Sequence, residues 1–393
     1  MHRKETDTNE NRKGSNGMKP LGIYLHIPFC RSKCLYCDFC SIPHPESDVI
    51  ERYVEALCRD LERRAQDCRH HAVDSVFFGG GTPSLLPPEL LLRVLDTLVR
   101  CYHVSADAEI TLECNPATAN AVALERLRRG GFNRLSIGLQ STHANELCAL
   151  GRIHSFADFE RTLSDARRAG FSNVSADLMS GIPLQTVESY LQSIERLAAL
   201  GPEHISAYGL SIEEGTPFFK SRDRLELPDE EAAREMYFRG IDCLQANGYA
   251  QYEISNFAKP GYESRHNLKY WSCDEYLGFG VAAYSDFGGD RFGNSRDLSA
   301  YIEGRPIECE RETPSLSERK NEYVMLRMRL RAGISASAFA ARFGDSLADS
   351  FGNRLLGYEK QGLVCRVGDA IAFTPRGFYL SNAILSEVLD FSN

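Results

Sequence analysis

The sequence predicts an α/β fold with a parallel sheet, followed by a smaller module of different pattern. Three observations support this. Short apolar runs alternate with longer stretches of helical periodicity between residues 21 and 208. That alternation ends after Tyr208. Beyond Pro314, helical stretches precede a short hairpin.

Six apolar runs are predicted strands, at residues 21–27, 75–78, 109–113, 134–138, 174–178 and 204–208. Between them lie predicted helices at residues 49–65, 88–101, 121–129, 156–169 and 186–200. Each connection is long enough for a helical crossover, so the strands should be parallel. Six such units can form a doubly wound sheet or an open, partial barrel. Both architectures carry their chemistry at the carboxyl ends of the strands.

The rest of the chain divides by composition. Residues 1–19 are polar and predict a flexible leader without the apolar run of a signal peptide. We place the sheet domain at residues 20–250, with a last helix at 229–247, and a Gly- and aromatic-rich segment at 251–313. Residues 314–393 predict a winged-helix-like module, with helices at 317–330, 335–343 and 346–361 and hairpin strands at 362–366 and 370–374.

Composition excludes several classes of protein. With 43% hydrophobic and 25% charged residues, the chain of 393 residues can bury a core. Its formal charge of 45 − 54 = −9 argues against a nucleic-acid partner, and the basic residues of the C-terminal module are not clustered. No apolar run approaches the ~20 residues of a membrane span, so we expect no stable membrane insertion. An odd count of 13 cysteines without a signal peptide indicates a cytoplasmic protein with reduced thiols.

The strongest motif is a C-x3-C-x2-C run formed by Cys30, Cys34 and Cys37. Structural zinc sites usually take four ligands from two separated pairs, and no second C-x2-C pair follows. Three cysteines on one loop fit a [4Fe–4S] cluster with one iron open to a small molecule. We expect Cys40 to be a bystander. As a fourth ligand it would instead close the cluster and indicate an electron carrier.

A glycine loop, Gly79 to Gly81 followed by Thr82 and Pro83, comes directly after the predicted strand at 75–78. Without Cβ atoms its backbone can approach a ligand closely. The loop lacks the lysine and the spacing of a phosphate-binding P-loop.

Several further motifs accompany these two. They are YLHIPFC at 24–30, ECNP at 113–116, SIGLQS at 136–141, GRIH at 151–154 and DLMSGIP at 177–183. Together they resemble the radical S-adenosylmethionine (SAM) superfamily. Within it they are similar to the branch of oxygen-independent coproporphyrinogen III oxidases and HemW-type heme chaperones. The resemblance implies a partial (β/α)6 barrel with a winged-helix-like C-terminal module.

The resemblance also implies a site. Cys30, Cys34 and Cys37 would hold the cluster, and the amino and carboxylate groups of SAM would bind the open iron. The residues implied in SAM binding are Gly80, Gly81 and Thr82 at the methionine end, Glu113 at the amine or ribose, Gln140, Arg152 and Asp177 at further contacts, and Tyr24 beside the cluster.

Other residues separate the oxidase from the chaperone. Phe39 stands where the oxidase carries a further cysteine in a C-x-C arrangement, and only a short, mostly polar segment precedes Tyr24. The H-N-x-x-Y-W motif of the chaperones is present as His266, Asn267, Tyr270 and Trp271. The resemblance links this motif to heme, and imidazole is a common axial ligand of heme iron. The alternative is that His266 and Asn267 only hold a loop and Trp271 belongs to the core.

We therefore expect a heme chaperone that passes heme to an acceptor protein, and whose cluster takes SAM and needs a reductant. No catalytic residue is assigned, and the acceptor is not identified by the sequence. The first alternative is an oxygen-independent coproporphyrinogen III oxidase-like enzyme. The second is a radical enzyme that uses the same scaffold on another substrate.

Overall fold

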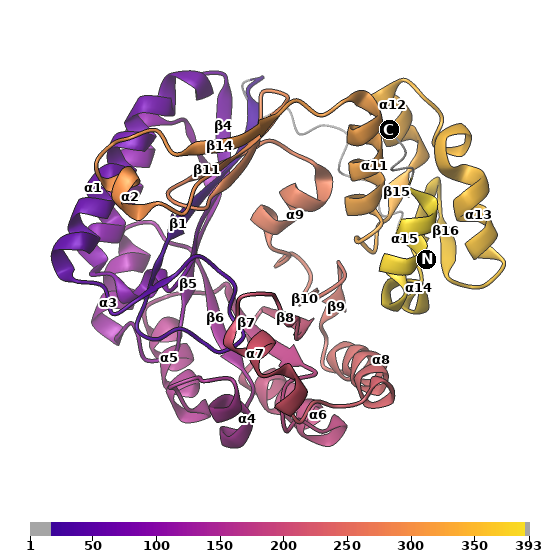
Figure 1. The fold of residues 1–393 in the computed structure, drawn as a ribbon, viewed down its shortest axis with the longest axis horizontal. Coiled ribbons are helices and arrows are strands. Elements are labelled where there is room, and N and C mark those ends of the chain that lie inside the picture. The colour runs from indigo at the N-terminus through magenta and orange to yellow at the C-terminus, as the bar shows by residue number, and fades with distance from the viewer. Residues whose placement is uncertain (1–16, 390–393) are drawn as a thin grey trace.

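In the computed structural model, which describes residues 17–389, one 12-stranded sheet curves around an open interior (Figure 1). Its strand order is β14-β13-β12-β11-β1-β4-β5-β6-β7-β8-β10-β9. The predicted leader lies outside the described residues up to residue 16, and Lys19 already begins the first strand.

The six predicted strands are confirmed and are parallel to one another. They are β1 (Lys19–Ile27), β4 (His71–Gly80), β5 (Val104–Cys114), β6 (Arg134–Gln140), β7 (Val174–Ser180) and β8 (His204–Gly209). Four residues of the Gly- and aromatic-rich segment form β11 (Tyr276–Phe279), which pairs with β1 as a seventh parallel strand. The strands of that segment thus join the sheet of the barrel.

Helices cover the outer face of this sheet (Figure 1). The predicted ones are confirmed as α1 (Ser47–Arg64), α2 (Pro88–Cys101), α3 (Ala121–Arg129), α5 (Phe156–Arg168), α6 (Val187–Leu200) and α8 (Glu230–Ala246). Local signals fix where they begin: Ser155 and Thr186 each form a capping box with the residue three positions on. A short helix, α4 (Ala144–Ala149), was not predicted.

Antiparallel strands extend the sheet at both edges. They are β12 (Tyr284–Phe287), β13 (Asp290–Asn294) and β14 (Glu308–Glu312) beyond β11, and β10 (Asn256–Ala258) and β9 (Ala250–Gln251) beyond β8. Within the described residues the two edges do not pair, so the barrel stays open. Helix α9 (Arg265–Ser272) packs against β4 on the inner side and against the C-terminal module (Figure 1).

The two faces of the sheet differ in chemistry because side chains alternate along a strand. On β5, Ile110 and Leu112 belong to the apolar core beneath the helices, whereas Glu109, Thr111 and Glu113 point into the barrel. The neighbouring strands repeat the pattern: their inward positions include Arg134 and Ser136 on β6, Ser175 and Asp177 on β7, and His204 and Tyr208 on β8. The interior of the barrel is therefore polar.

The C-terminal module has a core of its own, which includes Val324, Met328, Phe339, Leu355 and Phe373. Its helices are α11 (Leu316–Arg327), α12 (Ala336–Phe343), α13 (Asn353–Glu359), α14 (Pro375–Tyr379) and α15 (Ser381–Val388). The predicted hairpin is confirmed as β16 (Val364–Val367) and β17 (Ala370–Phe373), joined by β15 (Ile334–Ser335).

One predicted helix differs. Residues 346–361 form a π-helical turn, Ala348–Gly352, followed by the short α13. Glycines at 352 and 357 lower the helical propensity of this stretch. Within residues 17–389, none of the helices has both the length and the hydrophobicity needed to span a bilayer.

Candidate functional site

The cysteine loop leaves the carboxyl end of β1 and is closed at its base. Strand β2 (Phe29–Cys30) pairs with β3 (Ile42–Pro43), and the amide of His44 donates to the carbonyl oxygen of Cys30 at 3.1 Å. Cys30 is buried at this base, whereas Cys34 and Cys37 are partly exposed further along the loop. The pairing of β2 with β3 therefore holds the three thiols over the end of the barrel.

A cavity of about 130 Å³ opens beneath the loop. It is lined by the three predicted cluster ligands and by all but one of the predicted SAM residues: Cys30, Cys34, Cys37, Gly80, Gly81, Thr82, Glu113, Gln140, Arg152 and Asp177. These side chains come from β2, from the ends of four successive strands and from the loops after them. The fold thus brings together residues that are far apart in the sequence.

The three thiols of the cysteine loop do not form a site for one metal ion in this arrangement. Among residues 17–389, no three His, Cys, Asp or Glu side chains lie where one ion could hold them together. In an iron–sulfur cluster each cysteine binds a different iron, so the thiols stand farther apart than the ligands of one zinc ion. Cys40 does not line the cavity. It packs against the barrel core, and its carbonyl oxygen bonds to Nε2 of His26 at 2.9 Å.

Gly80 and Gly81, at the end of β4, allow close contacts with neighbouring parts of the chain. A Cβ on Gly81 would lie 2.7 Å from the carbonyl oxygen of Phe29, and one on Gly80, whose φ is +109°, would lie 2.5 Å from the ring of His26. The close approach that Gly81 allows is thus to the start of the cysteine loop and that of Gly80 is to β1, while both glycines still line the cavity. Thr82 adds a hydroxyl that donates to Sγ of Cys30 at 3.6 Å.

Two partly buried carboxyl groups line the cavity from below. Glu113 lies one residue before the end of β5 and accepts a hydrogen bond from the amide of Gly80 at 3.0 Å. Burial and the nearby carboxyl of Asp177 raise the pKa of Glu113 to about 8, and burial raises the pKa of Asp177 to about 6. A cationic group bound here would favour the ionised carboxylates. An ammonium or sulfonium ligand therefore suits this side of the cavity.

Arg152 joins the cysteine loop to the barrel. Its guanidinium donates to Sγ of Cys34 at 3.4 Å and to Oδ1 of Asn115 at 2.7 Å, while its buried Nε has no partner. The amide of Asn115 donates in turn to the hydroxyl of Thr82 at 2.7 Å. Gln140, at a φ of +73°, accepts from the hydroxyl of Tyr208 at 2.9 Å. Asn115 and Tyr208 also line the cavity but were not predicted from the sequence, although Asn115 belongs to the ECNP motif.

Tyr24 is the one predicted SAM residue that does not line the cavity. Its hydroxyl lies 3.1 Å from Nδ1 of His26, and its ring stacks on Phe77 with 6.3 Å between centroids. Its link to the cysteine loop runs through His26, whose Nε2 is hydrogen-bonded to the carbonyl oxygen of Cys40.

The H-N-x-x-Y-W motif lies elsewhere, on α9. His266 is only 1% exposed, and both of its ring nitrogens are engaged, Nδ1 with the hydroxyl of Ser75 at 3.0 Å and Nε2 with the hydroxyl of Tyr270 at 2.8 Å. Ser75 precedes Gly80 on β4 by about 17 Å at a rise of about 3.3 Å per residue. None of the motif's residues lines the cavity.

Helical periodicity divides this motif. His266 and Tyr270 are four residues apart and turn toward the sheet, whereas Asn267 and Trp271 share the next face of the helix and are half-buried. As the side chains stand, coordination of an iron by Nε2 of His266 requires the Tyr270 hydroxyl to move away.

Comparisons with known proteins agree with the motifs. Residues 24–197 match the Radical SAM superfamily, and residues 315–380 match the HemN C-terminal domain. The heme chaperone HemW of Bacillus subtilis (strain 168) is 36% identical over 374 residues, which span 93% of this chain and 98% of that protein. HemW of Escherichia coli (strain K12) is 35% identical over 379 residues, spanning 94% and 98%. These matches confirm the resemblance inferred from the sequence.

A solved structure shares the fold. Coproporphyrinogen III oxidase (HemN) from Escherichia coli superposes with a TM-score of 0.84 and 24% identity, covering 95% of this chain and 91% of that one. At this identity the likeness establishes the fold, and it confirms the predicted barrel with its C-terminal module.

The three-cysteine arrangement predicts the outcome of iron loading. After anaerobic reconstitution with iron and sulfide, the protein should hold about four irons per chain. Cys34→Ala should lose most of that iron, because the loop offers no replacement thiol at the cavity. Cys40→Ala is the matched control and should keep it. Equal iron loss in both variants would contradict an open cluster site.

The carboxyl pair predicts how stability depends on pH. In the ligand-free protein Glu113 and Asp177 keep protons up to pH values of about 8 and 6, where unfolded carboxyls have lost theirs. The folded state then binds more protons than the unfolded state, so the free energy of unfolding should fall as the pH rises from about 5 to about 8. Urea unfolding of the cluster-free protein across this range measures the slope.

Glu113→Gln should flatten that decline, because the amide does not titrate. Glu160→Gln, at an exposed position of α5, is the control and should leave the slope unchanged. A slope that is the same in Glu113→Gln as in the wild type would show that this carboxyl is not responsible.

Proposed function

Because the chain belongs to the radical SAM superfamily and, within it, to the family of HemW-type heme chaperones, we propose that it binds heme and delivers it to an acceptor protein. The observation that carries the proposal is the extent of the match. HemW proteins align with more than nine-tenths of this chain, so the likeness extends beyond the barrel to α9 and the C-terminal module. The acceptor is a protein not yet identified.

We further propose that the cysteine loop carries a [4Fe–4S] cluster that binds SAM. Cys30, Cys34 and Cys37 would each hold one iron, and the backbone of Gly80 and Gly81 with the hydroxyl of Thr82 would contact the methionine end. When bound, such a cluster supplies single electrons for radical chemistry on SAM, and an external reductant must replace them. The reduced thiols that this requires suit a cytoplasmic protein.

The cavity supports SAM through its charges. Glu113 and Asp177 offer carboxylates to the amine and the positive sulfur of SAM, and Arg152 offers a guanidinium to its carboxylate. Gln140 adds an amide at the end of β6, and Tyr24 is linked to the cysteine loop through His26.

For heme we propose α9 as the site. Asn267 and Trp271 present a polar amide and a flat aromatic ring on one face of the helix. His266 and Tyr270 lie behind that face, hydrogen-bonded to each other. The proposal includes ligation of the heme iron by His266. For this, the iron must replace the hydroxyl of Tyr270 at Nε2 of His266.

A second candidate function is that of a coproporphyrinogen III oxidase, favoured by the shared fold. Phe39 argues against the oxidase function. This residue lines the cavity and is 68% exposed, and it stands at the position where the oxidase resemblance requires a thiol.

Hemin titration tests the site on α9. The wild type should take up about one hemin per chain, with a shifted Soret band and a fall in the fluorescence of Trp271, the single tryptophan. Tyr270→Phe removes the hydroxyl that competes for Nε2 of His266, so it should bind hemin at least as tightly as the wild type. His266→Ala should lose the spectral signature of imidazole ligation.

The opposite result is equally clear. If His266 only holds α9 in place, His266→Ala lowers the midpoint of thermal unfolding and leaves the hemin spectrum and stoichiometry as they were. That pair of results would remove His266 from the proposed ligands.

The oxidase candidate is tested by its product. Reconstituted protein, supplied with SAM, a strong reductant and coproporphyrinogen III without oxygen, should form no protoporphyrinogen. Turnover at the level of an authentic oxidase in the same assay would make the oxidase the better description.

A further inference from the structure

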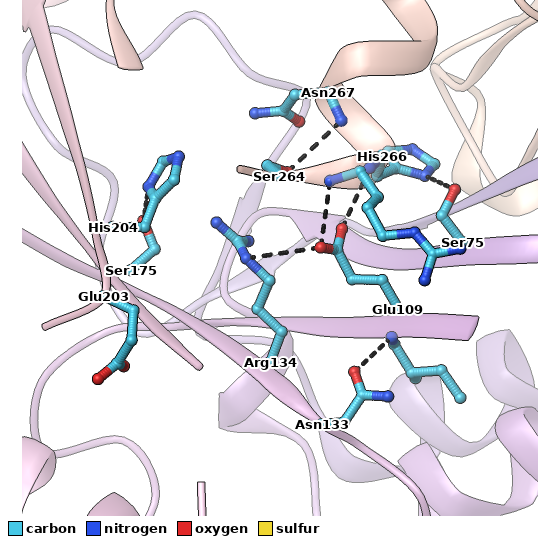
Figure 2. Close-up of polar contacts among 12 residues, drawn as sticks. Ser75, Glu109, Asn133, Arg134, Ser175, Glu203, His204, Ser264, His266 and Asn267 are labelled. Atoms are coloured by element: carbon cyan, nitrogen blue, oxygen red, sulfur yellow. Dashed lines mark hydrogen bonds and ion pairs between the residues drawn. The ribbon is translucent and has the colours of Figure 1, made fainter. Parts of the chain in front are cut away.

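The first turn of helix α9 is hydrogen-bonded to a buried carboxylate, that of Glu109. The amides of Arg265 and His266 donate to Oε2 and Oε1 of Glu109, each at 3.1 Å, across 156 and 157 positions of the chain (Figure 2). The first amides of a helix have no partner within the helix, and the helix dipole favours negative charge at this end. A carboxylate that accepts from two of these amides therefore holds the start of α9 strongly.

The charge of Glu109 is balanced by a second buried group. Glu109 is 5% exposed and Arg134 is 2% exposed, and 3.9 Å separates Oε2 from Nε of the guanidinium. Figure 2 shows the two side chains pointing toward one another from β5 and β6. Nε of Arg134 has no hydrogen-bond partner, so this ion pair is what compensates its burial.

Neutral contacts complete the anchor. Ser264 caps the helix through its hydroxyl, which accepts from the amide of Asn267 at 3.5 Å, and its own amide donates to the hydroxyl of Tyr252 at 3.2 Å. That hydroxyl lies 2.8 Å from Nε2 of His204, whose Nδ1 lies 2.7 Å from Ser175. Polar groups of several barrel strands thus converge on the turn that starts α9. Among the acceptors at this turn, Glu109 is a carboxylate, whereas Ser264 and Tyr252 offer hydroxyl groups.

We infer that Glu109, with Arg134 as its counter-ion, is the positioning residue of the H-N-x-x-Y-W motif on α9. It fixes where α9 begins and so where Asn267 and Trp271 lie. The inference rests on the proposed heme function. Neither Glu109 nor Arg134 lines the SAM cavity, although the charge of Arg134 also lowers the pKa of Glu113 and of Asp177 there.

The test uses the full-length, cluster-reconstituted protein with Glu109→Gln. Glutamine keeps the size of the side chain but removes its charge and one of its two acceptor oxygens. Hydrogen–deuterium exchange of the α9 amides should become roughly ten- to a hundredfold faster, as expected for lost charge-assisted hydrogen bonds. The Kd for hemin should rise at least tenfold, while iron content stays at the wild-type level and the Kd for SAM stays within twofold.

Glu203→Gln is the matched control. Glu203 also pairs with an arginine, Arg167 at 2.8 Å, and also accepts from a backbone amide, that of Val174 at 2.9 Å, but it does not contact α9. This variant should leave both the exchange of α9 and the Kd for hemin unchanged.

A double variant separates positioning from stability. Glu109→Gln leaves Arg134 buried without its ion-pair partner, which by itself destabilises the barrel. Glu109→Gln combined with Arg134→Met removes that charge and should recover much of the thermal stability. The exchange of α9 should stay fast and the hemin Kd high, because the carboxylate is still missing.

Four results would overturn the inference. The first is unchanged α9 exchange in Glu109→Gln, and the second is an equal acceleration of that exchange in Glu203→Gln. The third is recovery of hemin binding together with stability in the double variant. The fourth is faster α9 exchange in Glu109→Gln with an unchanged hemin Kd, which leaves the proposed heme function intact. If the wild type itself takes up no hemin, the proposed function fails as well, so the two failures are distinguishable.

Discussion

Charge buried inside the barrel must be paired, and the guanidinium of Arg134 is the cation on which this pairing depends. Its positive charge opposes the rise in the pKa of Glu113 and of Asp177 in the cavity, and it forms an ion pair with Glu109 at the start of α9. Burial, then the charge of Lys269 and then that of Arg134 keep the pKa of His266 low, at about 3, so this ring is neutral. An apolar interior would need no such cation, but it could hold neither a cationic ligand nor the amino end of a helix.

The two candidate sites follow from this polar interior. Strand β5 carries Glu109, Thr111 and Glu113 on one face, so a single strand contacts α9 through Glu109 and lines the cavity with Glu113. The cysteine loop covers the carboxyl end of the strands, and α9 occupies the open side of the barrel (Figure 1). The cysteine loop and the H-N-x-x-Y-W motif are therefore separate, yet both are held by side chains of the same sheet. A carrier that binds heme apart from its SAM site is consistent with this separation.

Local sequence patterns predict much of this arrangement. Alternating apolar runs and helical stretches predicted the six parallel strands and their helices. Half of the residues that line the cavity were named from the motifs, whereas Asn115, Tyr208 and the other lining residues were not. Tertiary contacts decided the rest. Strand β11 is four residues long within a glycine-rich segment, and its pairing with β1 and β12 defines it. The burial of His266 depends on Ser75 and Glu109, which are nearly two hundred and more than one hundred and fifty positions away. Gly81, just after β4, is required by the backbone at Phe29, a contact that no local pattern reveals.

The most direct test of the account is a structure of the reconstituted protein with hemin and SAM, solved without oxygen. The account predicts a cluster on Cys30, Cys34 and Cys37, SAM in the cavity between Gly80 and Asp177, and the porphyrin against α9 at Asn267 and Trp271. A porphyrin bound in the cavity over the cluster, with α9 untouched, would contradict it. That result would describe an enzyme acting on a porphyrin rather than a carrier of heme.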